Sequence, residues 1–297
     1  MEEFSYKELG RLLVLAAKMK KTPAKYQKVL NEQCLAMIFD KSSTRTRVSF
    51  DVGMTQLGGK ALLLRGDELQ LGRGEPISDT AKVLSRYVQG IMIRTFAHKM
   101  VEELAEHSSV PVINGLTDTH HPCQVLADLQ TILESFKKLK GLQMVYVGDG
   151  NNMAHSLMIG AAKTGMHCKI VCPAGYQPQT SLLSFAQREG GKNGARIEVT
   201  QKVQGSVKGA DVVYTDVWTS MGQEAESKKR LNDFQGFQVN EELMAESPKA
   251  IFLHCLPAHR GEEVSAGVMD GKRSRVWDQA ENRLHAQKAL LATLMAK

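Results

Sequence analysis

The residues with the clearest chemical purpose form a hydroxyl-rich, doubly basic turn, Ser-Thr-Arg-Thr-Arg, at positions 43–47. An apolar segment, residues 34–39, precedes the turn, and a pattern of helical spacing follows it, so the turn is predicted to open a helix. The first N–H groups of a helix lack partners inside it and the helix dipole is positive there, which favours a phosphate. The side-chain donors are Ser43, Thr44, Arg45 and Thr46. The sequence therefore predicts an anion site, and the alternative is an ordinary helix cap with a solvated basic first turn.

Further polar residues in the first half of the chain follow a predicted strand or open a predicted helix. Arg94 comes directly after the apolar strand 91–93, which places it at the carboxyl edge of a sheet. His121 and Gln124 are three residues apart at the start of a helical pattern, with Pro122 at a suitable first position, so both can face one ligand. By themselves these residues could also be a surface arginine and a capping or core histidine.

A glycine-containing turn at positions 148–152, Gly-Asp-Gly-Asn-Asn, connects a predicted strand to a predicted helix. Dinucleotide-binding turns carry a third glycine in the pattern G-x-G-x-x-G, but Met153 stands at that position. Nicotinamide binding is therefore not expected. Asn152 can offer its amide to a carboxylate, or it can cap the helix.

Asp216 ends the predicted strand 212–215, and its carboxylate could pair with an ammonium group. The polar loop beyond it contains Ser220 and Met221, which could offer hydroxyl and backbone donors. The alternative for Asp216 is a solvated turn aspartate.

His254 and Cys255 follow the predicted strand 250–253. A thiol beside an imidazole suggests a protease-like nucleophile. However, neighbouring side chains in an extended chain point to opposite sides, so these two are not expected to form a nucleophile and base pair.

These candidate groups need a scaffold that brings strand ends together. Predicted strands alternate with predicted helices, and the strands are residues 34–39, 61–64, 91–93, 110–113, 144–147, 168–172, 196–199, 212–215 and 250–253. One of the helices is predicted from Asp79 to Val88. The alternation predicts an α/β fold with two doubly wound parallel-sheet domains. Ligands in such sheets bind beyond the carboxyl ends of the strands, where the candidate residues lie.

The composition is that of an ordinary globular protein, with 42% hydrophobic and 24% charged residues. A length of 297 residues is large for one hydrophobic core, so two domains are expected. The formal net charge of +6 suits anionic small molecules. Nucleic acid is not an expected partner, because the lysine clusters are short, scattered and without interleaved aromatic residues.

The cysteines indicate a reducing environment, since there are five of them and they lie mainly in apolar strands. Cys168 and Cys172 share one strand without a second pair at zinc spacing, so no metal site is expected. The sequence has no run of 18 apolar residues and no apolar leader, so neither a membrane span nor secretion is expected. The expected location is cytoplasmic.

The turn at positions 43–47 also resembles the phosphate motif of the aspartate/ornithine carbamoyltransferase family. Further segments match motifs of the ornithine branch of that family, in the same order and over nearly the whole chain. They are Met92-Ile93-Arg94-Thr95, His121-Pro122-Cys123-Gln124, Gly148-Asp149-Gly150-Asn151-Asn152, Asp216 with Ser220-Met221-Gly222, His254-Cys255-Leu256-Pro257 and Glu281-Asn282-Arg283. Several spaced motifs in one order are far harder to meet by chance than one.

The resemblance implies transfer of a carbamoyl group from carbamoyl phosphate to the side-chain amine of ornithine, giving citrulline and phosphate, in arginine metabolism. No cofactor and no metal are implied, and the assembly is a homo-oligomer, by resemblance a trimer. The expected domains are residues 1–137 for carbamoyl phosphate and 138–278 for ornithine. The last helix, residues 279–297, is expected to pack back on the first domain, with the active site in the cleft between the domains.

The resemblance also assigns roles to individual residues. Carbamoyl phosphate is expected to contact Ser43, Thr44, Arg45, Thr46, Gln70, Arg94, His121, Gln124, Cys255, Leu256 and Arg283. Ornithine is expected to contact Asn152, Asp216, Ser220 and Met221. The expected catalytic residues are Arg94, His121, Cys255 and Arg283. Gln70, in a polar glycine-rich stretch, is expected to reach a neighbouring subunit's active site.

Two other functions stay open at this stage. The catalytic chain of aspartate carbamoyltransferase shares the motifs of the first half. Asp216, the loop at Ser220 and the segment at Cys255 favour ornithine, because a second carboxylate on the acceptor would need extra basic residues there. A non-catalytic protein that binds a phosphate metabolite would keep the anion turn without the amine site, and a turnover assay would separate it from an enzyme.

Overall fold

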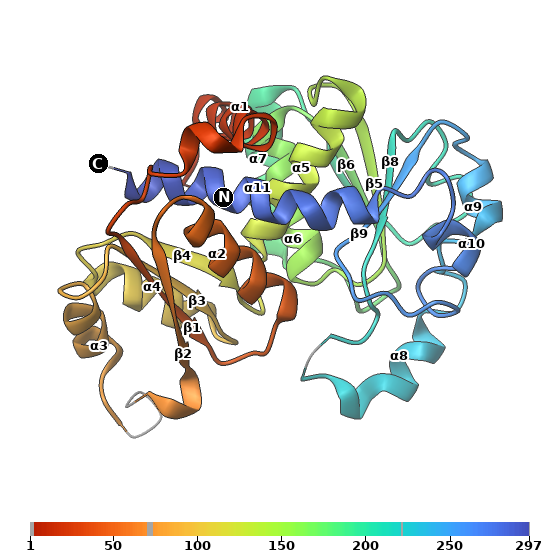
Figure 1. Ribbon diagram of the computed structural model, residues 1–297. Coiled ribbons are helices and arrows are strands. Elements are labelled where there is room, and N and C mark those ends of the chain that lie inside the picture. Colours follow the sequence, from red (N-terminus) through yellow and green to blue (C-terminus); the bar gives the residue numbers. More distant parts are fainter. Residues whose placement is uncertain (1–2, 70–73, 221, 297) are drawn as a thin grey trace. The chain divides into compact units, whose positions relative to one another are not determined.

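The computed structural model describes residues 3–69, 74–220 and 222–296. The chain divides into two compact units, each built on its own parallel sheet (Figure 1). The four-stranded unit comprises residues 10–130 and 281–297, and the five-stranded unit comprises residues 1–9 and 131–280. The predicted α/β class with two parallel sheets is confirmed. The predicted domain limits, residues 1–137 and 138–278, stay a prediction.

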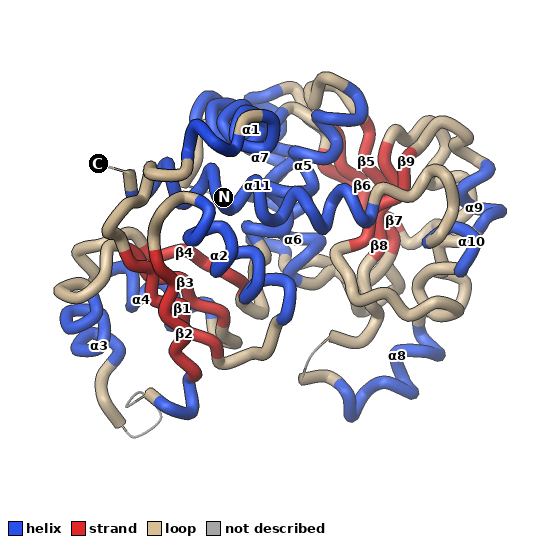
Figure 2. The backbone as a smooth tube through the Cα atoms, in the orientation of Figure 1, coloured by secondary structure: helices blue, strands red, loops and turns tan. Residues whose placement is uncertain are grey.

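In the four-stranded unit the sheet has the order β2-β1-β3-β4, with all neighbours parallel (Figure 2). Its strands are β1 (Cys34–Phe39), β2 (Lys60–Arg65), β3 (Gly90–Arg94) and β4 (Val112–Leu116). The helices that belong to it wholly or in part are α1 (Tyr6–Lys21), η1 (Pro23–Tyr26), α2 (Thr44–Gln56), η2 (Gly66–Glu68), α3 (Ile77–Leu84), α4 (His98–His107), α5 (Pro122–Phe136) and α11 (Val276–Met295). The limits between the units fall within α1, α5 and α11.

Both faces of this sheet are covered. Ala36 and Ile38 of β1 pack with residues of α3 and α4 in one apolar cluster. The alternate residues Leu35 and Met37 are buried as well. Strands that are apolar on both sides need such double cover, which is typical of parallel sheets with helical crossovers.

In the five-stranded unit the order is β7-β6-β5-β8-β9, again parallel throughout. Its strands are β5 (Gln143–Val147), β6 (His167–Val171), β7 (Ile197–Thr200), β8 (Val212–Thr215) and β9 (Ile251–His254). Its helices are α6 (Asn152–Thr164), α7 (Thr180–Asn193), η4 (Glu224–Glu226), α8 (Ser227–Asp233), α9 (Glu241–Ala245) and α10 (Ala266–Met269), with the adjoining parts of α1, α5 and α11.

Each sheet has one point at which the chain changes direction across it. After β1 the chain continues to β2 on one side and later to β3 on the other, and β5 lies in the same way between β6 and β8. Such a switch point leaves a crevice at the carboxyl ends of the two diverging strands, and ligands bind there. The turn at 43–47 follows β1, Arg94 ends β3, and Asp216 follows β8, so the predicted residues lie at these two points.

Several predicted elements have different limits in the structure. The strand predicted at 110–113 is β4 (Val112–Leu116), because Pro111 has no N–H to donate to a neighbouring strand. The helix predicted from Asp79 to Val88 is α3 (Ile77–Leu84). Ser85 is its C-terminal cap, and the Ser85 hydroxyl donates to the Ala81 carbonyl at 2.6 Å.

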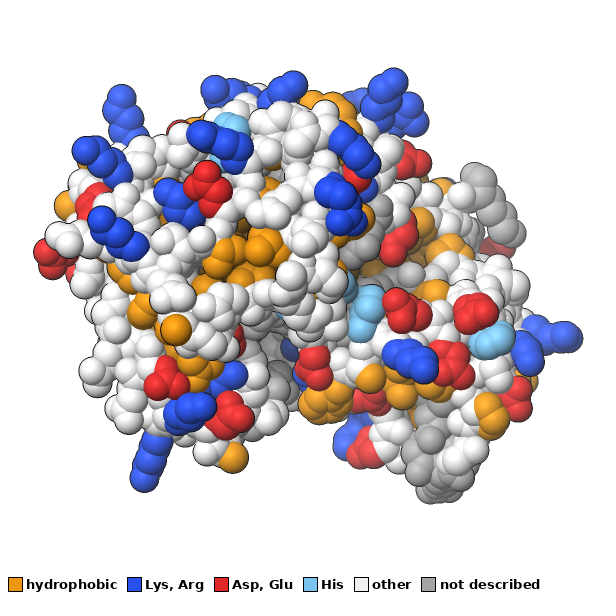
Figure 3. Space-filling view, turned by 180° about the vertical axis from the view of Figure 1, so that it is seen from behind, with side chains coloured by type: hydrophobic (Ala, Val, Ile, Leu, Met, Phe, Trp, Pro, Cys, Tyr) orange, Lys and Arg blue, Asp and Glu red, His pale blue; other side chains and the backbone are white. Residues whose placement is uncertain are grey.

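On the face shown in Figure 3, the Lys and Arg side chains are scattered among acidic and neutral ones and do not gather in one patch. A steering field from the net charge of +6 is therefore spread over this face. Among the described residues, no helix is both long and apolar enough to cross a membrane.

We expect Gly150→Ala to destabilise the five-stranded unit. A Cβ atom at Gly150 would lie 2.4–2.5 Å from backbone atoms of residues 176–178, which is far inside van der Waals contact. Overpacking of this kind costs about 1–3 kcal/mol. The matched control is Gly191→Ala in α7, where no atom lies within 4 Å of the added Cβ.

Alanine is the better helix former by about 0.5–1 kcal/mol, so the control should be slightly more stable than the parent. Urea unfolding of the three proteins measures both effects. Equal stability of the Gly150 variant and the parent would contradict the close backbone approach.

Candidate active site

The predicted anion turn lies at the N-terminus of α2. Ser43 is the helix cap, and its hydroxyl accepts a hydrogen bond from the Thr46 backbone N–H at 3.2 Å. Thr46 is fully buried and Arg45 is half-buried, whereas Thr44 and Arg47 are exposed. The turn therefore aims part of its donor set inward, and Arg47 belongs to the solvated part.

Arg94 is brought to this turn by strand register. Phe39, the last residue of β1, pairs with Arg94 at the end of β3, and the Asp40 backbone N–H donates to the Arg94 carbonyl at 2.9 Å. Arg94 is only 7% exposed. An arginine that is held this far from water at a strand end is not a solvated surface residue.

His121 directly precedes α5 and is 7% exposed. Burial lowers the pKa of His121 well below its ordinary value, and the positive charges of Arg283, Arg94 and Arg45 lower it further. The imidazole is therefore neutral at physiological pH. A neutral imidazole can donate one N–H without adding a further positive charge to the site.

Arg283 is hydrogen-bonded to two other predicted residues, Thr46 and Gln124, which are far from it in the sequence. Its guanidinium donates to Gln124 Oε1 at 2.9 Å and to Thr46 Oγ1 at 3.2 Å. Arg283 is 3% exposed and Gln124 is 1% exposed. Thr46, Gln124 and Arg283 thus form one buried cluster. Gln70 lies outside the described residues.

Lys41 was not singled out from the sequence, yet the structure buries it beside the anion turn. Its ammonium forms an ion pair with Asp118, in the loop after β4, and lies 4.1 Å from the centre of the Phe96 ring, in the loop after β3. It therefore links the loops that follow β1, β3 and β4. A lysine just past a buried strand was the available signal, but a solvated lysine gives the same pattern.

In the five-stranded unit, Asp216 and Cys255 lie side by side. Thr215 of β8 pairs with His254 of β9, so the next residues of both strands meet at the sheet edge. The Cys255 thiol donates to Asp216 Oδ1 at 2.9 Å, and the same oxygen accepts from the Val217 N–H at 2.8 Å. Asp216 is 6% exposed, so its carboxylate is held in one orientation rather than solvated.

The His254 imidazole serves the fold and not the thiol. Its Nε2 lies 3.0 Å from Glu263 Oε1, and its Nδ1 accepts from the Leu256 N–H at 2.9 Å. Both ring nitrogens thus have partners other than Cys255, as the alternation of an extended chain predicted. Leu256 has a φ of 62°, which is unusual for a residue with a side chain, and its contact with His254 supports this turn.

Asn152 is the first residue of α6, but the helix cap is Asn151. The Asn151 side chain accepts from the Met153 N–H at 2.9 Å and the Ala154 N–H at 3.4 Å. The capping role considered for Asn152 therefore belongs to its neighbour. The Asn151 amide also lies 3.5 Å from the hydroxyl of Ser220, and Met221 lies outside the described residues.

Arg230 of α8 is a second residue that sequence reasoning missed. Its guanidinium bonds Asp149 Oδ2 at 2.7 Å and the Trp218 carbonyl at 2.9 Å, and it is 6% exposed. Burial raises the pKa of the Asp149 carboxyl, and Arg230 opposes that rise. The arginine ties the turn before α6 to the loop that contains Ser220.

The described residues offer two groups of possible metal ligands, and the one at the sheet edge is Asp216, His254 and Cys255, with ligand atoms within 4.8 Å of one another. The hydrogen bonds of Asp216 to Cys255 and of His254 to Glu263 already use these atoms. Each of these three side chains therefore already has a hydrogen-bond partner.

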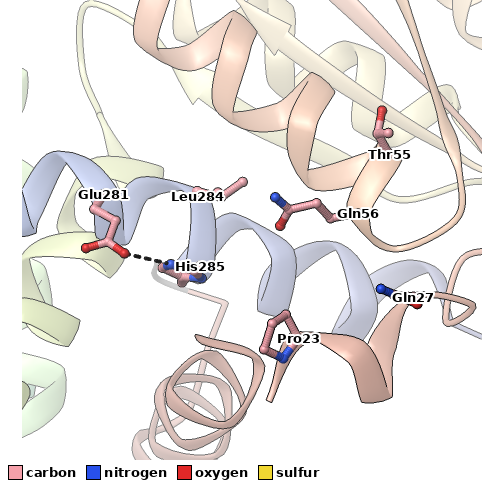
Figure 4. A pocket seen from close by; sticks show the side chains of 7 residues that line it. All are labelled: Pro23, Gln27, Thr55, Gln56, Glu281, Leu284 and His285. Atoms are coloured by element: carbon pink, nitrogen blue, oxygen red, sulfur yellow. Dashed lines mark hydrogen bonds and ion pairs between the residues drawn. The ribbon is translucent and has the colours of Figure 1, made fainter. Parts of the chain in front are cut away.

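A pocket of about 560 Å³ lies elsewhere on the four-stranded unit (Figure 4). It is lined by Pro23, Gln27, Thr55, Gln56, Glu281, Leu284 and His285. None of these is a predicted site residue. The polar clusters at the strand ends, and not this pocket, therefore carry the functional argument.

Comparison with known proteins gives a family for the whole chain. The carbamoyl-P binding domain of aspartate/ornithine carbamoyltransferase matches residues 1–134, and its Asp/Orn binding domain matches residues 140–294. The chain belongs to the aspartate/ornithine carbamoyltransferase family. The predicted resemblance is confirmed, and with it membership of a family of carbamoyl-transferring enzymes.

Individual relatives agree with this family over nearly their whole length. Ornithine carbamoyltransferase of Oceanobacillus iheyensis is 57% identical over 299 residues, with 100% of this chain and 93% of the relative covered. The ornithine carbamoyltransferase of Geobacillus stearothermophilus is 57% identical over 297 residues, with 99% and 95% covered.

Solved structures of the family share the fold of this chain. Ornithine carbamoyltransferase from Pyrococcus furiosus has a TM-score of 0.95 at 51% identity, with 99% of this chain and 95% of that chain covered. Anabolic ornithine carbamoyltransferase from Campylobacter jejuni has a TM-score of 0.92 at 40% identity, with 98% and 96% covered.

The buried state of His121 predicts a pH dependence of stability. The pKa of His121 in the folded protein lies below the unfolded value of about 6.5. Above that pH the ring is neutral in both states, so it does not make the stability depend on pH. Below it, the unfolded chain takes up a proton that the folded chain refuses, and stability falls. In His121→Asn this loss is absent.

The stability advantage of the parent over the variant should therefore shrink by about 1.4 kcal/mol per pH unit below about pH 6, until the folded pKa is reached. Urea unfolding between pH 7.5 and 5 measures the difference. His107→Asn, at an exposed position, controls for the loss of a histidine. A pH-independent difference for His121→Asn would mean that the folded protein protonates this ring normally.

Proposed function

We propose that this protein is an ornithine carbamoyltransferase. It transfers the carbamoyl group of carbamoyl phosphate to the side-chain amine of L-ornithine and releases L-citrulline and phosphate. The observation that carries the proposal is the buried convergence of Arg94, His121 and Arg283 at the switch point of one sheet, in a chain whose full-length relatives are named ornithine carbamoyltransferases.

The phosphate end of carbamoyl phosphate is assigned to the turn at 43–47. The helix N-terminus supplies backbone N–H groups, and the hydroxyls of Ser43, Thr44 and Thr46 add donors. Arg45 pairs with the phosphate oxygens through its two-pronged guanidinium. Arg45 is half-buried, whereas Arg47, two residues later, is exposed. The partial burial of Arg45 supports this role.

The carbamoyl carbonyl is assigned to His121, Arg94 and Thr46. Negative charge develops on that oxygen when the amine attacks, and fixed donors in a dry site stabilise such charge strongly. The neutral imidazole of His121 donates an N–H, and Arg94 adds positive charge. Gln124, Arg283, the thiol of Cys255 and the Leu256 carbonyl hold the rest of the carbamoyl group.

Ornithine is assigned to the strand ends of the five-stranded unit. The Asp216 carboxylate, which Cys255 and the Val217 N–H hold in place, faces the α-ammonium. Asn152, Ser220 and Met221 face the α-carboxylate. With both groups fixed, the side-chain amine is directed to the carbamoyl carbon, and positioning supplies much of the rate.

The reaction needs no cofactor, because a neutral amine is nucleophile enough for this activated carbonyl. Its lone pair forms the new C–N bond and gives a tetrahedral oxyanion, which collapses as the C–O bond to phosphate breaks. The nitrogen loses one proton to a phosphate oxygen, or to Cys255 if the thiol has first passed its own proton to Asp216. Because the free amine is protonated at neutral pH, the enzyme must either bind its neutral form or remove a proton from it before the attack.

One assay separates this function from its alternatives. Citrulline formation is measured with carbamoyl phosphate and ornithine, and parallel reactions contain aspartate or putrescine as acceptor. Ornithine should be preferred by a wide margin. Preference for aspartate would indicate the other branch of the family, and no turnover with any acceptor would indicate a binding protein.

We expect Asp216→Ala and Arg45→Ala to separate the two substrates. Removing one partner of a desolvated charge pair costs about 3–5 kcal/mol, or roughly two to four orders of magnitude in kcat/KM. Asp216→Ala should lose turnover with ornithine and still bind carbamoyl phosphate in calorimetry. Arg45→Ala should lose carbamoyl phosphate binding while it stays folded.

The exposed Arg47→Ala is the matched control for Arg45→Ala and should bind nearly as the parent does. Full ornithine turnover by Asp216→Ala, or unchanged carbamoyl phosphate affinity of folded Arg45→Ala, would refute the assignment of the residue concerned.

We propose further that the protein works as a homotrimer in the cytoplasm, as part of arginine metabolism. The family resemblance supports the trimer and the contribution of Gln70 to a neighbouring active site. The five free thiols are typical of a reducing compartment. Light scattering under assay conditions tests the assembly, and full activity of a monomer would overturn it.

A further inference from the structure

Three helices of the four-stranded unit face one another with pairs of polar residues. Each pair is one helical turn apart and so lies on a single face. The pairs are Thr46 and Ser49 in α2, Gln124 and Asp128 in α5, and Arg283 and Gln287 in α11. All six residues are at least 92% buried, and Thr46, Asp128 and Gln287 have no exposed surface. Asp128, Ser49 and Gln287 were not predicted as site residues.

Hydrogen bonds join the six residues into one network. Gln124 Nε2 donates to Asp128 Oδ1 at 2.8 Å, and Gln124 Oε1 accepts from Arg283 at 2.9 Å. Arg283 Nε donates to Gln287 Oε1 at 2.8 Å, and Gln287 Nε2 donates to the Ser49 hydroxyl at 2.9 Å. The Ser49 hydroxyl in turn donates to the Arg45 carbonyl at 2.6 Å. The network therefore runs from Asp128 to the backbone of the anion turn.

The chemistry of its two charged members gives this network a direction. A carboxylate only accepts hydrogen bonds, and a guanidinium only donates them. Gln124 lies between Asp128 and Arg283, so its NH2 group must face the carboxylate and its oxygen must face the guanidinium. If the amide were reversed, two donors and two acceptors would oppose each other in a fully buried place, at the cost of unsatisfied polar groups.

We propose that Asp128 is a positioning residue that determines the specificity for the carbamoyl group. It fixes the Gln124 amide so that an oxygen atom, and not an NH2 group, is presented at the carbamoyl end of the substrate. An amide oxygen has two lone pairs, so it can accept from Arg283 and from the carbamoyl NH2 group together. The inference rests on the proposed function and on the role assigned there to Gln124.

Acetyl phosphate is the natural probe of this idea, because it carries a methyl group where carbamoyl phosphate carries NH2. It cannot donate a hydrogen bond to Gln124 but presents the same phosphate to the anion turn. A site that accepts a hydrogen bond from its ligand discriminates against an analogue that lacks the donor. The preference for carbamoyl phosphate over acetyl phosphate therefore reports the orientation of Gln124.

The test is Asp128→Asn, which keeps the shape but adds a donor, so that Gln124 loses its single orientation. Dissociation constants of both acyl phosphates are measured by calorimetry on the full chain without ornithine. The parent should prefer carbamoyl phosphate, and the variant should lose roughly tenfold of that preference, with acetyl phosphate affinity unchanged. Ser135→Ala, which removes a local hydrogen bond elsewhere in α5, is the control and should keep the preference.

A purely structural role for Asp128 gives a different result, since a general loss of order would weaken both ligands equally. That outcome, or an unchanged preference in folded Asp128→Asn, would overturn the proposal. Gln124→Ala adds a second check. With no amide left to orient, Asp128→Asn should cause no further change of preference in this background, and a further change would show that Asp128 acts by another route.

Asp128→Glu keeps a group that only accepts, and it serves if Asp128→Asn does not fold. It should retain the preference for carbamoyl phosphate even where its melting temperature falls, and equal weakening of both ligands would contradict the proposal. Citrulline formation by the parent is measured in parallel. A parent without turnover would contradict the proposed function, whereas an active parent with an unchanged Asp128→Asn preference contradicts this inference alone.

Discussion

The constraint on which the four-stranded unit depends is the cost of holding positive charge away from water. Arg94 and Arg283 are each at least 93% buried, and a buried cation is expensive unless hydrogen-bonding partners surround it. For Arg283 the protein meets this cost with two amide acceptors, Gln287 on the same helix and Gln124 on α5. It also keeps His121 neutral, so the cluster gains a donor without another charge. An anionic substrate then completes the balance of charge.

The pattern of helices and strands was predictable because the signals for each element lie in its own residues and in those next to it. The anion turn could be placed from the strand before it and the helix after it, and β1 and β8 have the limits that the sequence indicated. The order of the strands could not be read in this way, since nothing local says that β3 lies beside β1 and not beside β2. That order decides which strand ends meet, and therefore which side chains share a site.

The same distinction holds for the site residues: local motifs indicated some of them, but their contacts follow only from packing. Motifs found Arg283 and Gln124, but their contact joins positions 159 residues apart and follows only from packing. Lys41 and Arg230 were missed because a basic residue in a polar segment is usually solvated, and only the structure shows that both are buried and paired with carboxylates, Lys41 with Asp118 and Arg230 with Asp149. The pairing of Asp216 with Cys255 depends on the register of β8 and β9. Resemblance could name these residues, and geometry gives the reasons for their positions.

The close approach at Gly150 reaches beyond folding. Its backbone N–H donates to the Tyr176 carbonyl at 2.8 Å, so the loop after β6 lies directly against the turn that begins α6. That loop has no part in the chemistry assigned to this protein, yet it determines where the turn can run. Insertions or deletions among residues 176–178 would therefore move the turn that leads to Asn152, without altering any residue to which we assign a substrate contact.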